Sequence, residues 1–156
     1  ADCIPVLLYD RQRRIVAAVH AGWRGTVNRI LAKTLHRMQS AYGTEGTDII
    51  ACIGPGISLD SFGGGVGVYE TFRTENFPME YISVWKPETH KYHIDLWAAN
   101  RLQLSDFGVP PRQIENAGIC TYRQHEDFFS ARRLGIKSGR ILSGIMLNGQ
   151  EKEERK

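Results

Sequence analysis

Two short apolar runs open the chain, and a polar stretch joins them. Residues 4–9 and 14–20 each have the length of a core strand, and the polar segment Asp-Arg-Gln-Arg-Arg at 10–14 connects them. A polar connection of this length favours a β-hairpin. This pairing constrains the fold strongly, because the residues that flank the two runs must then meet at the open end of the hairpin.

Strand-like and helix-like segments alternate along the rest of the chain. Apolar positions recur at helical spacing over residues 26–42, with Thr26 as a predicted N-cap and Gly43 as a predicted C′ residue. A second long helix is predicted over residues 95–107, capped by Asp95. Further predicted elements are strands over 48–53, 81–85, 113–119 and 140–147, and helical turns over 69–75 and 126–133. Such alternation within one core predicts a layered α/β domain.

Length and composition exclude several classes of protein. A chain of 156 residues builds one well-buried core and is too short for two ordinary domains. A net charge of +3, with arginine clusters separated by turns, does not support nucleic-acid binding. No apolar run reaches the roughly 20 residues that cross a bilayer, and no signal peptide is visible. Three widely spaced cysteines do not form a disulfide framework, so we expect a reducing, cytoplasmic location.

The two ends of the sequence lead to predictions about the bounds of the domain. The chain begins with Ala1 rather than Met and enters a core strand with no lead-in, so we expect that an upstream segment is missing from this sequence. Residues 1–148 are predicted to form the domain, and residues 149–156 a solvated tail of balanced charge.

Cys3 and His20 are the candidate metal ligands. If the first two runs form a hairpin, the thiol and the imidazole lie near each other across its open end. Thiolate and imidazole together suit zinc or copper. Two ligands are an incomplete set, because a catalytic zinc has three protein ligands and a water. The alternative is a buried structural thiol and a histidine whose ring is satisfied by the backbone.

The residues after His20 are typical of an anion-binding corner. Gly22 and Gly25 permit tight backbone geometry, and free amides at the following helix start attract anions. Arg24 is suited to bind a phosphate through two hydrogen bonds, with Trp23 as a wall of the site. An ordinary strand–turn–helix connection, with Trp23 in the core and Arg24 on the surface, explains the same residues equally well.

Aromatic and basic residues gather near the end of the chain. His125, Phe128, Phe129, Arg132 and Arg133 form a cluster that suits the far wall of a pocket for a flat ring. Core packing accounts equally well for the two phenylalanines. The glycine run at 63–67 lacks the strand before it and the helix after it that a dinucleotide-binding loop requires.

Five motifs in order along the chain closely resemble the laccase-domain family. Members of that family were named multicopper polyphenol oxidases and were later described as purine nucleoside phosphorylases. The resemblance covers the chain to about Leu147 and rests on Ala-Asp-Cys-x-Pro at 1–5, His-Ala-Gly-Trp-Arg-Gly at 20–25, Ile-Gly-Pro-Gly-Ile at 53–57, His-Ile-Asp-Leu at 93–96 and Phe-Phe-Ser-Ala-Arg-Arg at 128–133. It implies a single-domain α/β sandwich of the α-β-β-α type with a mixed sheet, monomeric and cytoplasmic.

The resemblance also implies a metal, generally zinc, bound by one Cys and two His. Cys3 and His20 match two of these ligands, and the third is a His in a segment upstream of this sequence. The implied activity is phosphorolysis of adenosine, inosine, guanosine and methylthioadenosine, with deamination of adenosine. In place of the acidic segment that relatives carry, residues 63–67 read Gly-Gly-Gly-Val-Gly, which removes carboxylates and a helix start.

On this basis the expected function is zinc-dependent purine nucleoside phosphorolysis with adenosine deamination. Asp2 is expected to move protons, Arg24 to hold phosphate, and Phe129 and Arg132 to line the nucleoside pocket. One alternative is a copper-dependent polyphenol oxidase, for which five scattered histidines are too few to build a multicopper cluster. The other alternative is a non-catalytic or regulatory fragment, because one ligand is missing.

Overall fold

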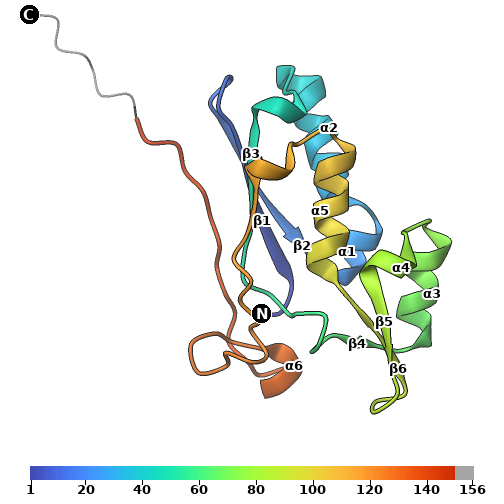
Figure 1. Cartoon of the computed structure of the whole chain (residues 1–156). Coiled ribbons are helices and arrows are strands. Elements are labelled where there is room, and N and C mark those ends of the chain that lie inside the picture. The colour runs from blue at the N-terminus through green and yellow to red at the C-terminus, as the bar shows by residue number, and fades with distance from the viewer. Residues whose placement is uncertain (150–156) are drawn as a thin grey trace, which may run out of the picture.

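A mixed four-stranded sheet is the centre of the structure, a computed structural model that describes residues 1–149 (Figure 1). Strands β1 (Ile4–Asp10), β2 (Ile15–Ala21), β3 (Ile49–Ile53) and β7 (Ile114–Asn116) pair in the order β2-β1-β3-β7. The β3–β7 pair is parallel and the other two pairs are antiparallel. A smaller antiparallel sheet has the order β4-β6-β5, from β4 (Gly63–Gly64), β5 (Ser83–Lys86) and β6 (Lys91–Ile94). The predicted α/β class with a mixed sheet is confirmed.

Helices cover one face of the four-stranded sheet. They are α1 (Trp23–Val27), α2 (Ile30–Tyr42) and α5 (Leu96–Asp106), and α2 packs beside both β2 and α5 (Figure 1). Helices α3 (Val66–Thr74) and α4 (Met79–Ile82) adjoin the smaller sheet, α6 (Ala131–Leu134) lies near the N-terminus, and 3-10 turns η1 (Gly46–Asp48) and η2 (Pro111–Gln113) precede β3 and β7. None of the helices within residues 1–149 combines the length and apolar composition that crossing a membrane requires.

The strand alternation of β1 separates the core from the opposite sheet face. Ile4, Val6 and Leu8 are fully buried on the helix side, where they join Leu31 and Leu35 of α2 in one apolar cluster. Burying side chains of this size contributes roughly 1.5–3 kcal/mol each, which fixes the strand register. The alternate residues of β1 face the other side of the sheet, along which the segment before residue 149 runs (Figure 1).

The predicted long helix over 26–42 is wrong in one respect, because the structure divides it. Helix α1 begins at Trp23 after an N-cap at Gly22, and Arg29 takes a left-handed conformation (φ 56°) before α2 begins. Thr26 is therefore not an N-cap. It is buried inside α1, where its hydroxyl donates to the carbonyl of Ala21. Gly43 is confirmed as the left-handed residue that ends α2.

Other predicted elements changed length or type. Residues 140–147 are not a strand; they form no regular structure, and Leu142 is 97% exposed. An apolar run without a neighbouring strand leaves its backbone groups to water. Helix α3 begins within the glycine run, at Val66 after an N-cap at Gly65, so the helix start is retained there. Strands β4 and β6 were not predicted, and of the predicted tail only Gly149 lies within the described residues.

The buried carboxylate of Asp10 stabilises the turn between β1 and β2. It accepts hydrogen bonds from the backbone amides of Gln12 (3.0 Å) and Arg13 (2.9 Å). Burial acts to raise the pKa of Asp10, but the Thr44 hydroxyl, these two amides and the Arg13 guanidinium together hold that pKa below its usual value. The charged form is therefore the one that the turn binds.

Candidate functional site

Cys3 and His20 lie together at the open end of the first hairpin. The register pairs Ile4 with Ala21 and Pro5 with His20, so Cys3 precedes the first pair and His20 belongs to the second. A Cβ placed on Gly22 would lie 2.8 Å from the Cys3 Sγ and 3.7 Å from the His20 Nε2. Both donor atoms therefore border the same small space, which is open because residue 22 has no side chain.

The donor set fits part of a zinc or copper site. A thiol sulfur and an imidazole nitrogen are ligands that both metals accept. Within residues 1–149, no group of three or more His, Cys, Asp and Glu side chains is placed to hold a metal. Cys3 is half-buried, and burial raises the pKa of its thiol, whereas the His20 side chain is exposed. The residues present thus supply two donors and leave one side of the space accessible.

Two cavities meet beside Cys3 and Trp23. The first, of about 500 Å³ and here called the basic cavity, is lined by His20, Gly22, Arg24, Asn28 and Lys33 among others. The second, of about 330 Å³ and here called the aromatic cavity, is lined by Ile57, Phe62, Leu96 and Arg132 among others. Cys3 and Trp23 line both. The basic cavity and the aromatic cavity thus adjoin at Cys3, one of the two candidate metal ligands.

Trp23 and Arg24 lie at the start of α1, directly after Gly22. The Arg24 guanidinium stacks over the Trp23 ring at 4.4 Å from its centroid, and the Arg24 side chain is exposed at the rim of the basic cavity. Such stacking orients the guanidinium without neutralising its charge. Trp23 lines both cavities, and its role as a wall of an anion site stays a prediction.

Asp2 joins three distant segments of the chain. Its carboxylate accepts from the Thr121 hydroxyl (2.7 Å) and from the Arg132 backbone amide (2.7 Å), and its carbonyl accepts from the Ile57 amide (2.9 Å). Asp2 adopts a left-handed conformation with φ 70°, which is a strained geometry for a residue with a side chain. These contacts hold the chain next to Cys3 in a fixed position.

Arg132 and Phe129 occupy different surroundings. Arg132 lines the aromatic cavity, its guanidinium donating to the Gly63 carbonyl (3.1 Å) and lying 5.4 Å from the Phe62 ring centroid. The Phe129 ring is half exposed and lies against Gly139, outside the residues that line either cavity beside Cys3. The role of Phe129 in a nucleoside pocket stays a prediction.

Sequence reasoning missed several residues that line these cavities. Lys33, Asn28, Phe62 and Leu96 come from α2, the α1–α2 break, the loop before β4 and the start of α5. Their residue types occur throughout the chain, and only the packing of α2 and α5 against the sheet brings them beside Cys3. The His-Ile-Asp-Leu motif that contains Leu96 was the one available signal.

Comparisons with known proteins identify relatives of this chain. The chain is 61% identical over 148 residues to a purine nucleoside phosphorylase of Bacteroides thetaiotaomicron, covering 95% of this chain and 55% of that protein. It is 48% identical to adenosine deaminase RL5 of an unknown prokaryotic organism, covering 93% of this chain and 55% of that protein. The chain thus spans about half the length of these curated relatives.

Solved structures share the fold of this chain. The crystal structure of a hypothetical protein YfiH of Bacillus licheniformis matches with a TM-score of 0.78 and 33% identity, over 85% of this chain and 50% of that one. The family model described as multi-copper polyphenol oxidoreductase laccase matches residues 1–148, which include Cys3, His20 and both cavities. The chain therefore belongs to the multi-copper polyphenol oxidoreductase laccase family.

Proposed function

We propose that this chain carries the reaction centre of a purine nucleoside phosphorylase that also deaminates adenosine. The observation that carries the proposal is the meeting of a basic and an apolar cavity at Cys3, beside His20. A nucleoside and a phosphate are chemically unlike, and two adjoining compartments of different polarity suit them. Relatives of this chain named purine nucleoside phosphorylase and adenosine deaminase support the assignment.

The basic cavity is the proposed site for phosphate. Arg24 and Lys33 supply two positive charges, and the Asn28 amide supplies a neutral donor. A guanidinium binds an oxyanion through paired hydrogen bonds, while an ammonium acts as a point charge. In phosphorolysis a phosphate oxygen bonds to C1′ of the ribose as the C1′–N9 bond breaks, so the role of these residues is to hold the attacking oxygen at the sugar.

The aromatic cavity is the proposed site for the purine. Trp23 and Phe62 present aromatic rings, and Ile57 and Leu96 are buried apolar neighbours. Flat heteroaromatic rings are stabilised by such surfaces. Arg132, whose guanidinium lies near the Phe62 ring, adds hydrogen-bond donors at the edge of the cavity. Phe129 remains the other residue proposed for this pocket.

The metal proposed for the site is zinc, with Cys3 and His20 as two of its ligands. When bound, zinc supplies Lewis-acid activation of water at neutral pH, which the deamination of adenosine requires. Gly22 leaves the space in which both donors can approach one ion. Asp2 is the proposed proton carrier for the departing base. Because both its carboxylate oxygens already accept hydrogen bonds, its contacts equally support a role in holding Cys3 in place.

A monomer in the cytoplasm that binds neither nucleic acid nor membranes is part of the same proposal. All three cysteines are free thiols, which is the state that a reducing compartment maintains. Copper-dependent oxidation of phenols, which the family description suggests, is the competing function. The five histidines favour one metal over a copper cluster, since they are spread over the fold: His20 on β2, His36 on α2, His90 in the turn between β5 and β6, His93 on β6 and His125 in a loop.

Metal binding by the 156-residue chain tests the site directly. Cobalt(II) is titrated as a spectroscopic substitute for zinc, and binding through a thiolate is read from the sulfur-to-cobalt absorption band. Wild type and Cys52→Ser are expected to show the band, because Cys52 lies exposed on β3 away from both cavities, and Cys3→Ser is expected to lose it. A band that persists in Cys3→Ser contradicts the assignment of the ligand.

Product analysis then tests the reaction. The chain is incubated with adenosine, with and without phosphate, and the products are identified by mass spectrometry. Adenine with ribose 1-phosphate indicates phosphorolysis, and inosine without phosphate indicates deamination. Oxidation of a phenol under added copper that Cys3→Ser abolishes would favour the oxidase instead. Absence of all three activities supports the hypothesis that this chain is a non-catalytic fragment.

A further inference from the structure

A third cavity lies apart from the Cys3 site, between the smaller sheet and the segment before α6. Its volume is about 410 Å³, which is within the usual range for small-molecule sites. It is lined by three cationic side chains (Lys91, Arg123 and Arg132) and one carboxylate, that of Asp60. We call it the Lys91 cavity. Its lining is more strongly charged than that of either cavity beside Cys3.

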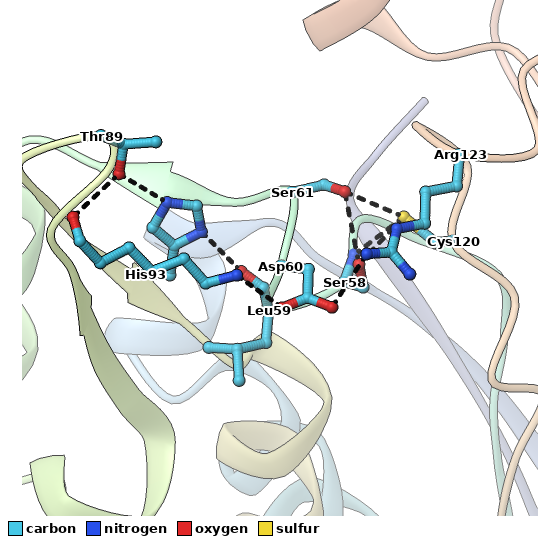
Figure 2. Close-up of polar contacts among 9 residues, drawn as sticks. Ser58, Leu59, Asp60, Ser61, Thr89, His93, Cys120 and Arg123 are labelled. Atoms are coloured by element: carbon cyan, nitrogen blue, oxygen red, sulfur yellow. Dashed lines mark hydrogen bonds and ion pairs between the residues drawn. The ribbon is translucent and has the colours of Figure 1, made fainter.

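The single carboxylate that lines this cavity already forms two ion pairs. Asp60 pairs with Lys86 at 2.6 Å and with Arg123 at 3.0 Å, and Figure 2 shows the second of these contacts. The hydrogen bond and the charge of Lys86 hold the pKa of Asp60 below its usual value, so it stays ionised at neutral pH. Within residues 1–149, Lys91 and Arg132 form no ion pair with an acidic group. Positive charge therefore exceeds negative charge around the cavity.

Hydrogen bonds hold the His93 ring in one wall of the cavity, and further polar residues line it. His93 is 5% exposed, and Figure 2 shows its ring fixed between the Leu59 carbonyl, which accepts from Nδ1 at 2.9 Å, and the Thr89 hydroxyl at 3.2 Å from Nε2. A Cβ on Gly63 would lie 3.0 Å from Nε2, so strand and ring are in close contact. The hydroxyls of Ser61 and Tyr122 add hydrogen-bonding groups to the lining.

We propose that the Lys91 cavity binds the phosphate group of a small phosphate monoester. An oxyanion supplies a negative partner for the cations of Lys91 and Arg132, and it accepts hydrogen bonds from hydroxyl groups. The volume of the cavity exceeds what inorganic phosphate alone would fill. This site is separate from the metal site and from the basic cavity, with which it shares no lining residue. Arg132 lines both the Lys91 cavity and the aromatic cavity, so an anion bound here acts on a residue of the proposed purine pocket.

Amide chemical shifts of the full 156-residue chain test the proposal. The ¹⁵N-labelled protein is titrated with ribose 5-phosphate, with inorganic phosphate, and with ribose as the uncharged control. Ribose 5-phosphate is expected to give saturable shifts at Ser61, Gly63 and Tyr122, inorganic phosphate weaker shifts at the same amides, and ribose none. Absence of shifts there overturns the site, and equal affinity for the two anions overturns the monoester as its ligand.

Charge-neutral variants assign the binding to these side chains. Lys91→Gln removes one exposed cation and is expected to raise the dissociation constant of ribose 5-phosphate about tenfold. Lys137→Gln, exposed and outside the cavity, is the matched control and is expected to bind like wild type. Arg24→Gln is expected to weaken only the anion-induced amide shifts around Gly22, in the basic cavity. Loss of binding at one cavity can therefore be distinguished from loss of binding at the other. Unchanged affinity in Lys91→Gln contradicts the inference.

Discussion

The space at Gly22 gives the sharpest test of the metal site. In Gly22→Ala the added Cβ would lie 2.8 Å from the Cys3 sulfur, and van der Waals contact requires roughly 3.5 Å or more. The sulfur must therefore move by about 0.7 Å, which exceeds the ~0.2 Å tolerance of a metal–ligand distance. Because a cysteine side chain rotates easily, this movement costs the fold little, but it removes a ligand atom from its position.

We expect Gly22→Ala to weaken metal binding about 100-fold, or ~2.8 kcal/mol at ~1.4 kcal/mol per tenfold change. Its free energy of unfolding should change by less than about 1 kcal/mol, because the backbone at residue 22 (φ −67°, ψ 169°) suits alanine. Gly65→Ala is a close control: Gly65 also caps a helix (φ −65°, ψ 167°), and nothing lies within 4 Å of its added Cβ.

Cobalt titration with zinc competition measures the affinity, and urea denaturation measures the stability. The reasoning requires that Gly65→Ala binds metal like wild type and that the two variants have similar stability. Equal metal affinity in Gly22→Ala and wild type would refute the view that this space holds the ion. Equal loss in both glycine variants would show that the helix start, rather than the contact with Cys3, determines binding.

Two further changes test the fold that supports the site. Asp10→Asn should lower the free energy of unfolding by about 1–3 kcal/mol at pH 7, since it removes the charged acceptor of a buried turn, while the exposed Asp127→Asn should not. Because the pKa of Asp10 is lowered by folding, its contribution is present above the unfolded pKa of ~3.9 and is lost as the pH falls through the folded value. Chemical denaturation from pH 7 to pH 3 should therefore show the difference shrinking, and a constant difference would contradict the assigned role. Gly46→Ala should lower the free energy of unfolding by at least about 2 kcal/mol, because its Cβ would lie 2.5 Å from the backbone of Gly108. Gly65→Ala should lower it little, and thermal or urea unfolding measures both variants. Equal stability of these two variants would exclude a tight backbone contact at residue 46.

Local patterns predicted the elements that the sheet core requires. The apolar runs at 4–9 and 14–20 and the strand at 48–53 match β1, β2 and β3 within one residue at each end, and the helix at 95–107 matches α5. Asp95 is confirmed as its cap, accepting from the Ala98 amide at 2.9 Å. Buried strands and capped amphipathic helices can be predicted from the sequence because the patterns that indicate them lie within a few consecutive residues.

Elements that depend on distant partners were predicted poorly. Strand β6 pairs with both β4 and β5, but each of these strands is four residues or shorter, too short to show a clear alternation. No local pattern indicates the left-handed conformation of Arg29, which divides α1 from α2. The guanidinium of Arg29 donates to the carbonyl of Glu75, a residue far along the chain. The apolar residues at 140–147 resemble a strand in the sequence, yet no strand within residues 1–149 pairs with them.

The sequence by itself determined the hairpin and hence the approach of Cys3 to His20, because strand pairing depends on two nearby apolar runs and the short turn between them. It also determined the family, through motifs that lie in order along the chain. Only the tertiary structure decided which groups surround that pair. Lys33, Phe62 and Arg132 line the cavities beside Cys3 from three separate segments of the chain, and their positions follow from tertiary packing rather than from any local spacing.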